Sequence, residues 1–193
     1  MTPAASPASA HTAWHVALLR GVNVGGNTKV PMAALKRIAA DLGFTDAITL
    51  LNSGNLVYRT TGVTAEQAAR LLHVAVASEL QVDTTVFVRT REELATILAA
   101  NPFVTEAVEA PSRLLVTLWD DTTSPAQRAL FAQAPVVRER FVVGVHAIYL
   151  WLPDGISASV VYEKTARALG NHITARNWGT MQKLLALMPG EAA

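Results

Sequence analysis

The first half of the chain alternates between apolar runs typical of strands and apolar positions at helical spacing. A continuous apolar run over 15–19 is typical of a strand that is covered on both sides. Pro31 and Gly43 then bracket a segment with apolar residues three and four apart, as expected at the start and end of a helix. The pattern predicts the order β-α-β-β-α-β, with elements at residues 15–19, 31–42, 47–51, 56–60, 64–80 and 82–90.

The second half repeats this order after a helix that begins at the capping box of Thr90 and Glu93 and ends at Asn101. Two halves of the same order, at a spacing of roughly 90 residues, indicate an internal duplication. We therefore expect an α+β protein of two tandem ferredoxin-like halves, each β-α-β-β-α-β plus a helix, with antiparallel sheets and helices on one face. The predicted elements lie at 114–119, 124–131, 136–143, 146–152, 157–169 and 172–176, before a last helix capped by Asn177.

The domain organisation follows from these elements. Residues 1–13 are small, contain prolines and lack both the basic start and the apolar run of a signal peptide, so we expect a disordered tail. We expect the first ferredoxin-like half over 14–103 and the second over 104–193, packed together as one compact unit.

Composition narrows the class of function. The 193 residues are 51% hydrophobic and 16% charged, so the chain can bury a sizeable core. The formal net charge of +1 provides no field to hold duplex nucleic acid or an anionic membrane. The chain has no cysteine, which excludes disulfides and thiolate chemistry and favours a cytoplasmic location. No apolar run approaches the roughly 18 residues that a membrane span needs.

A glycine-rich loop after the first strand carries the main functional signal. Its glycines let the backbone turn N–H groups into a concavity, which the positive charges of Arg20 and Lys29 bracket. In a ferredoxin-like unit the turn at 52–55 lies at the same edge, so loop and turn are expected to meet. The alternative is a plain strand-to-helix connection. The predicted anion-binding residues are Arg20, Asn23, Gly25, Gly26, Asn27, Lys29, Ser53 and Asn55.

Other motifs carry weaker signals. The glycine stretch lacks the Lys-Ser/Thr of a P-loop and the glycine spacing of a dinucleotide fingerprint. The five histidines show no paired ligand spacing, so we predict no metal site and no cofactor. Asp120 and Asp121 form either an acid pair or a solvated turn. A secondary candidate is the segment Arg176, Asn177 and Trp178, either a strand end with a helix cap and an anchoring indole or a place where a flat ligand stacks.

Several motifs together resemble the bacterial domain of unknown function 1697 family. The resemblance covers nearly everything from Val16 to Leu187, and it implies a compact cytoplasmic bacterial α+β protein with duplicated ferredoxin-like halves. The sequence departs from the usual family pattern at Thr28, at Gly179 and over 157–161. The motifs are LLRGVNVGG at 18–26, KVPM at 29–32, LGF at 42–44, SGN at 53–55, NPF at 101–103, PDG at 153–155 and RNW at 176–178.

Three functions remain open at this point. The first is a module that binds a small anion or nucleotide through the glycine-rich loop. The second is an enzyme that acts on a phosphorylated or carboxylated metabolite, and the third is a non-catalytic protein-interaction module. No catalytic residues are assigned, because the candidate positions carry amides and cations rather than groups that exchange protons near neutral pH. The expected partner is a small anionic ligand, and the sequence does not fix an oligomeric state.

Overall fold

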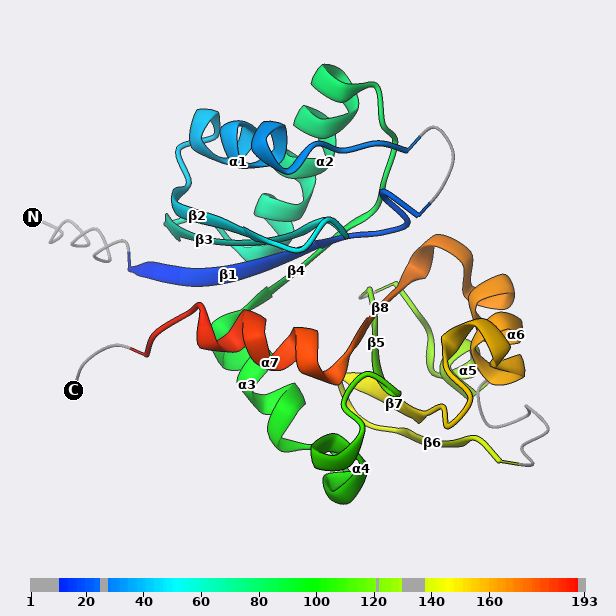
Figure 1. Ribbon diagram of the computed structural model, residues 1–193. Helices are drawn as coiled ribbons and strands as arrows, with labels where there is room; N and C mark the ends of the chain where they lie inside the picture. Colours follow the sequence, from blue (N-terminus) through cyan, green and yellow to red (C-terminus); the bar gives the residue numbers. More distant parts are fainter. Residues whose placement is uncertain (1–10, 25–27, 121, 130–137, 191–193) are drawn as a thin grey trace, which may run out of the picture.

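The computed structural model describes residues 11–24, 28–120, 122–129 and 138–190, and Figure 1 shows the path of the chain. Residues 1–10 of the predicted tail lie outside this range, whereas Thr12 and Ala13 already belong to the first strand. The first-half elements are β1 (Thr12–Leu19), α1 (Met32–Asp41), β2 (Thr45–Leu50), β3 (Asn55–Thr61), α2 (Ala65–Leu80), β4 (Val86–Thr90) and α3 (Arg91–Ala99).

The second half has the same order of elements and begins after α4 (Val104–Glu109), a short helix that the sequence pattern did not predict. Two 3-10 turns, at Ile156–Ala158 and Gly170–His172, flank its longest helix. The second-half elements are β5 (Leu114–Trp119), α5 (Pro125–Ala129), β6 (Arg140–Val143), β7 (Ala147–Trp151), α6 (Val160–Leu169), β8 (Ile173–Asn177) and α7 (Trp178–Ala186).

The two halves form two four-stranded antiparallel sheets of identical topology. The strand orders are β2-β3-β1-β4 and β6-β7-β5-β8, which is the ferredoxin-like order in both cases. The predicted α+β fold with two duplicated halves is therefore confirmed. In the part of the chain that the structure describes, no helix is long and apolar enough to cross a membrane.

Three hydrophobic cores stack through the molecule. The outer core of the first half lies between its sheet and the helices α1 and α2, and the outer core of the second half lies between its sheet and α6. A central core joins the opposite faces of both sheets with α3 and α7. The prediction of helices on one face of each sheet thus holds for α1 and α2 in the first half and for α6 in the second. The last helix of each half, α3 or α7, covers the opposite face of its sheet.

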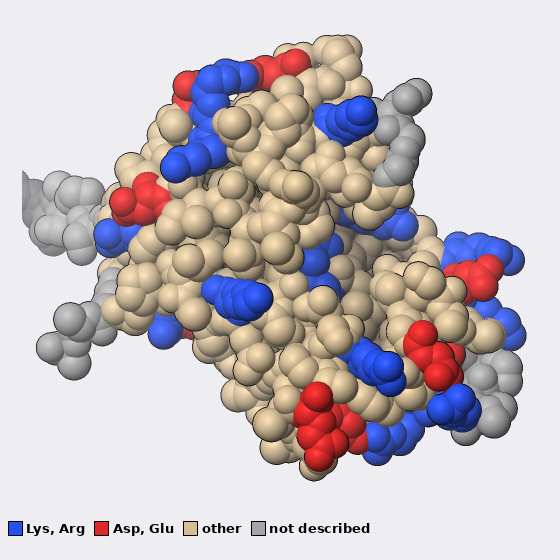
Figure 2. Space-filling view, in the orientation of Figure 1, with Lys and Arg blue, Asp and Glu red and all other residues tan. Residues whose placement is uncertain are grey.

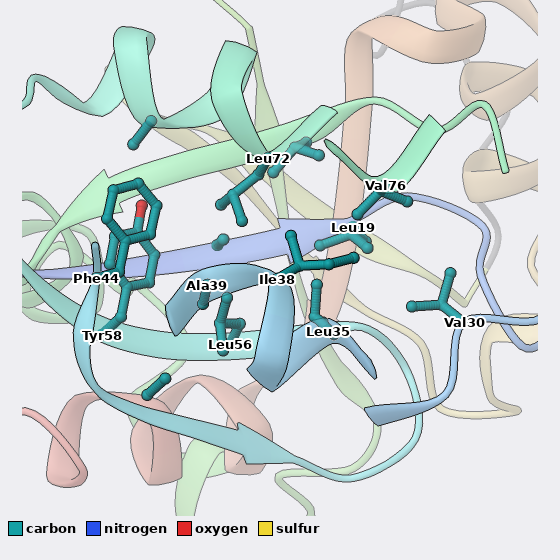
Figure 3. Close-up of a cluster of buried hydrophobic side chains, with 14 of the residues drawn as sticks. Leu19, Val30, Leu35, Ile38, Ala39, Phe44, Leu56, Tyr58, Leu72 and Val76 are labelled. Carbon is teal, nitrogen blue, oxygen red and sulfur yellow. The ribbon is translucent and has the colours of Figure 1, made fainter. Parts of the chain in front are cut away.

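The first outer core follows from strict alternation along the strands. Leu19 and Leu56 point toward α1 and α2, while their neighbours Leu18 and Val57 point into the central core. Figure 3 shows Ile38 from α1 and Leu72 from α2 packed against this face of the sheet. The rings of Phe44 and Tyr58 are stacked, with their centroids 4.5 Å apart. The Tyr58 hydroxyl is buried without a hydrogen-bond partner among the described residues.

Helix ends follow the capping signals closely, whereas strand ends depend on distant contacts. The capping boxes at Thr64 and Thr90 are confirmed, with each threonine accepting the expected backbone N–H. The predicted strand over 82–90 begins only at Val86. Thr84 precedes the strand, and its hydroxyl donates to the Arg20 carbonyl while its own carbonyl lies 2.9 Å from Nδ1 of His73 on α2.

A pseudo-twofold relation connects the two halves at their interface. Arg89 on β4 pairs with Val16 on β1, and Arg176 on β8 occupies the corresponding position opposite Val116 on β5. The Nη2 atom of Arg89 donates to the Trp119 carbonyl at 2.6 Å, and Nη2 of Arg176 donates to the Leu19 carbonyl at 2.8 Å. Each arginine therefore binds the last residue of the first strand in the opposite half, as in a self-complementary interface.

Candidate functional site

The glycine-rich loop is organised by Asn23, whose φ of 58° places it in the left-handed region that asparagine tolerates. Its backbone N–H donates to the Thr28 carbonyl, and its side chain both accepts from and donates to the backbone of Val30. The same amide donates to the Asn52 carbonyl at 2.6 Å. Asn23 therefore closes the loop and ties it to the turn between β2 and β3.

The turn packs directly against the end of β1, because Gly54 has no side chain. The Leu19 N–H donates to the Gly54 carbonyl at 2.8 Å. A Cβ on Gly54, whose φ is 72°, would lie 2.5 Å from a methyl group of Val22. Asn55 is buried and donates to the Leu50 carbonyl and the Ser53 hydroxyl oxygen. The structure thus brings Ser53 and Asn55 beside the loop.

The two basic residues that bracket the loop have different surroundings. Arg20 is half-buried and reaches the second half, where it donates to the Ile173 carbonyl and the Asn171 side chain, both at 3.0 Å. Lys29 is exposed and forms no hydrogen bond or ion pair with a described residue. Three further predicted residues, Gly25, Gly26 and Asn27, lie outside the described residues.

Arg176 is the residue that joins the two halves at the predicted turn. All five of its N–H groups have neutral protein acceptors, and no carboxylate among the described residues pairs with it. Burial lowers the pKa of Arg176 to about 10. The acceptors are the side chains of Asn55 and Thr174 and the carbonyls of Leu19, Ser53 and Ala175. Arg176 therefore supplies positive charge to its surroundings but has no N–H group left to donate to a ligand.

A pocket of about 250 Å³ lies between the turn of the first half and the second sheet, and we call it the junction pocket. Its polar lining consists of arginines, hydroxyls and one amide, without a carboxylate among the described residues. Its apolar lining comes from both halves. The lining residues are Leu51, Ser53, Ser112, Arg113, Leu115, Leu152, Ile156, Ala175, Arg176, Asn177 and Thr180.

Five polar side chains in the junction pocket have donors without a protein acceptor among the described residues, and one of them is the exposed hydroxyl of Ser112. The Ser53 hydroxyl accepts from Asn55 but donates to nothing, and the hydroxyl of Thr180 makes no hydrogen bond. The side-chain oxygen of Asn177 caps α7, which leaves its NH₂ group without a partner. Arg113 is exposed, and its guanidinium likewise has no acceptor. The pocket is therefore rich in donors and in positive charge.

The positive field extends beyond the pocket along the junction of the halves. Burial raises the pKa of the Tyr162 hydroxyl on α6, while the positive charges of Arg20 and Arg176 act in the opposite direction. On the face shown in Figure 2, Lys and Arg atoms lie in the recess between the halves, and further Lys and Arg atoms lie on the outer surfaces beside Asp and Glu atoms.

The secondary candidate segment divides into different roles. Arg176 and Asn177 line the junction pocket, whereas Trp178 is buried in the central core beside Met181 and Leu184. The structure therefore brings Ser53 from the main predicted set together with two of the three secondary residues. It adds Arg113 and Thr180, for which the local sequence held no signal, because they reach the turn only through the packing of the second half on the first.

A second pocket, of about 450 Å³, occupies the pseudo-equivalent place beside Arg89. Its charged lining is mainly acidic, with Glu66, Glu93 and Asp120. Burial opposes ionisation of Asp120, but the hydrogen bond from Thr122 and the contact with His172 outweigh it, so the pKa of Asp120 lies below its ordinary value. Its partner in the predicted acid pair, Asp121, lies outside the described residues.

Among the described residues no group of three His, Asp or Glu side chains is placed to hold a metal ion. The predicted absence of metals and cofactors stays a prediction.

Comparison with known proteins locates the chain in a family. Its fold is similar to that of the conserved bacterial protein SP0830 from Streptococcus pneumoniae, with a TM-score of 0.73 and 22% sequence identity over 93% of this chain and 100% of that chain. At this identity the likeness shows the fold alone. A search of curated proteins finds no match. The model of the family described as protein of unknown function (DUF1697) matches residues 13–149, more than half of the sequence, and the chain therefore belongs to the DUF1697 family.

Proposed function

We propose that the protein binds a small anion in the junction pocket, where the two halves meet beside the glycine-rich loop. The observation that carries this proposal is the composition of the lining: two arginines and three hydroxyl-bearing residues, without a carboxylate among the described residues. A site with many donors and no acidic group is electrostatically suited to a carboxylate or phosphate oxygen.

The two arginines have different roles in this proposal. The guanidinium of Arg113 has no acceptor among the described residues, so it can form a bidentate contact with an anionic group. Arg176 contributes charge from the wall of the pocket, because its N–H groups are already bonded to the protein. The NH₂ group of Asn177 and the N-terminal end of α7 add partial positive charge at the same place. The anion would replace part of the solvation that burial removes from Arg176.

The glycine-rich loop extends the same field. Arg20 is committed to acceptors of the second half, whereas the exposed Lys29 is available to a ligand. We therefore propose that the loop also contributes to anion binding through Lys29, whereas its residues Gly25, Gly26 and Asn27 lie outside the described residues. A nucleotide would be the larger version of such a ligand, with phosphates at the loop.

The ligand in this proposal is a small molecule rather than a polymer. A net charge of +1 provides little long-range attraction for a polyanion, so binding to random duplex DNA at physiological salt is expected to be weak or absent. We place the protein in the bacterial cytoplasm, a location that the absence of cysteine favours.

The pocket favours binding over catalysis. Its described lining contains no Asp, Glu, His or Lys side chain that could take up or release a proton near neutral pH. Hydroxyls and arginines alone can hold an oxyanion but do not supply a general base. The enzyme hypothesis therefore needs a group from outside the lining.

Isothermal titration calorimetry of the wild type with phosphate, sulfate and acetate tests the proposal. Arg113→Gln removes the exposed guanidinium and is expected to weaken anion binding about tenfold to hundredfold, without loss of fold stability. Lys29→Ala is expected to act in the same direction through the loop. The control is Arg70→Gln, which removes a guanidinium that is 62% exposed on α2 and outside the junction pocket. Absence of anion binding, or equal binding by Arg113→Gln and wild type, would contradict the proposal.

A further inference from the structure

The mouth of the junction pocket carries two exposed apolar side chains, one from each half. Leu51 follows β2 and is 59% exposed, and Ile156 begins the 3-10 turn after β7 and is 45% exposed. Exposed leucine and isoleucine side chains are ordinary when scattered singly over a surface. Here they face the same small pocket from opposite halves, so a bound molecule would contact both.

Leu51 also has an unusual backbone conformation. Its φ of 58° lies in the left-handed region, which glycine and asparagine adopt more readily than leucine. A leucine at this position is neither buried nor conformationally favoured. The unfavourable backbone conformation of Leu51 suggests that this residue has a role other than folding. Its position at the mouth of the pocket is consistent with contact to a ligand.

The interior of the pocket continues the apolar surface. Leu115 and Leu152 are buried, and Ala175 lies next to the arginine that supplies the charge. The lining of the pocket thus combines polar side chains, among them Arg113 and Thr180, with apolar ones. Its volume of about 250 Å³ corresponds to about eight water-sized groups of roughly 30 Å³ each. That volume is below the usual range for the pockets of drug-sized ligands and favours a small molecule.

Resting on the anion site proposed above, we infer that the ligand is a small amphipathic anion, a carboxylate or phosphate monoester with a short apolar group. Leu51 and Ile156 enclose the apolar group, and Arg113 binds the anionic group. The apolar group of the ligand contacts side chains from both halves, Leu51 from the first and Ile156 from the second, so a complete site requires both halves in contact.

A homologous series of carboxylates tests the apolar part separately from the charge. Calorimetric titrations with acetate, butanoate and hexanoate are expected to show affinity rising by up to about fourfold for each CH₂ group that is buried. Inorganic phosphate, which has no apolar part, is expected to bind more weakly than hexanoate. If acetate or phosphate binds through Arg113 but chain length has no effect, this inference is wrong while the anion site stands. If no probe binds, the proposed anion site fails as well.

The variant Leu51→Asn isolates the apolar rim without straining the backbone, because asparagine tolerates a positive φ. We expect it to weaken hexanoate binding about tenfold, to leave acetate binding within about twofold, and to keep or raise the melting temperature. Ile156→Ser is expected to show the same selectivity. Val145→Asn is the control, since Val145 is 77% exposed on the β6–β7 turn outside the pocket. Equal losses for acetate and hexanoate in Leu51→Asn would overturn the inference.

Discussion

The ends of the two first strands share one backbone arrangement but carry opposite charges. The N–H of Arg20 after β1 donates to the Thr85 carbonyl, and the N–H of Asp120 after β5 donates to the His172 carbonyl. The Arg20 side chain then crosses to the second half, whereas the Asp120 carboxylate folds back to accept from its own turn at Thr122. The backbone hydrogen bond that follows the first strand is thus the same in both halves, whereas the side chains of Arg20 and Asp120 at this position differ in charge and in partners.

The same contrast separates the two pockets at the junction. Arg176 lines a pocket with a second arginine and no described carboxylate, while its pseudo-equivalent Arg89 lines a pocket with three acidic side chains. A duplicated fold therefore offers two similar places of opposite polarity. The difference in charge between the pockets indicates that an anion site on this fold depends on a few side chains rather than on the fold itself. This dependence can be tested by single substitutions.

The largest expected effect comes from the arginines that hold the halves together. Arg176→Met removes bonds to two first-half carbonyls and to Asn55 and should lower the free energy of unfolding by about 3 kcal/mol. Arg89→Met removes two backbone contacts and should cost about 1–2 kcal/mol. Urea unfolding monitored by circular dichroism measures both. The loss stays moderate because no buried acid is left without its partner.

Arg37→Met provides the matched control for this pair. Arg37 forms exposed ion pairs with Asp41 and Glu79 on the outside of the first half, so its loss should cost less than about 1 kcal/mol. If Arg176→Met and Arg89→Met lower the free energy of unfolding equally, the additional hydrogen bonds of Arg176 contribute no net stability, and the predicted difference between the two arginines is wrong.

The fold was predictable because its signals are local. The capping box at Thr64, the turn residues at 52–55 and the alternation along β1 each depend on a few neighbouring residues, and repeating them gave the duplicated topology. The limits of β4 were not predictable, because Thr84 bonds to the carbonyl of Arg20, which is far away in the sequence. The short helix α4 gave no pattern, because none of its described side chains is buried.

The candidate site was predictable only in part. Topology placed the turn beside the loop, and the bond from Asn23 to the Asn52 carbonyl shows their contact. Arg113 and Thr180 could not be assigned, because the packing of the second half, not the sequence around them, brings them to Ser53. The structural role of Asn23 could not be predicted either, because the sequence does not distinguish an asparagine that closes a loop from one that binds a ligand.

A pair of tyrosines distinguishes the central core, which joins the halves, from the outer core of the first half. The Tyr149 hydroxyl donates to the Ile97 carbonyl on α3 at 2.6 Å, so Tyr149→Phe leaves a buried carbonyl without its partner and should cost about 1–2 kcal/mol. Tyr58→Phe removes a buried hydroxyl that has no described partner and should be neutral or stabilising by up to about 1 kcal/mol. Thermal and urea unfolding of the two variants measure the difference. A loss in Tyr58→Phe as large as that in Tyr149→Phe would show that the outer core holds a hydrogen bond of equal value.

The smallest expected effect concerns pH and separates Asp120 from Arg20. The folded pKa of Asp120 lies below its ordinary value near 4, so the stability that its carboxylate contributes is present above that pH and is lost as the pH falls through the lower folded pKa. Asp120→Asn should therefore flatten the acid limb of the unfolding free energy measured between about pH 2 and 5. Arg20→Gln loses its bonds to the second half at every pH in this range, so it should lower the curve without changing its shape. An unchanged acid limb in Asp120→Asn would mean that the stability of the turn after β5 does not depend on the charge of the Asp120 carboxylate. The opposite charges of Arg20 and Asp120 would then have no consequence for stability.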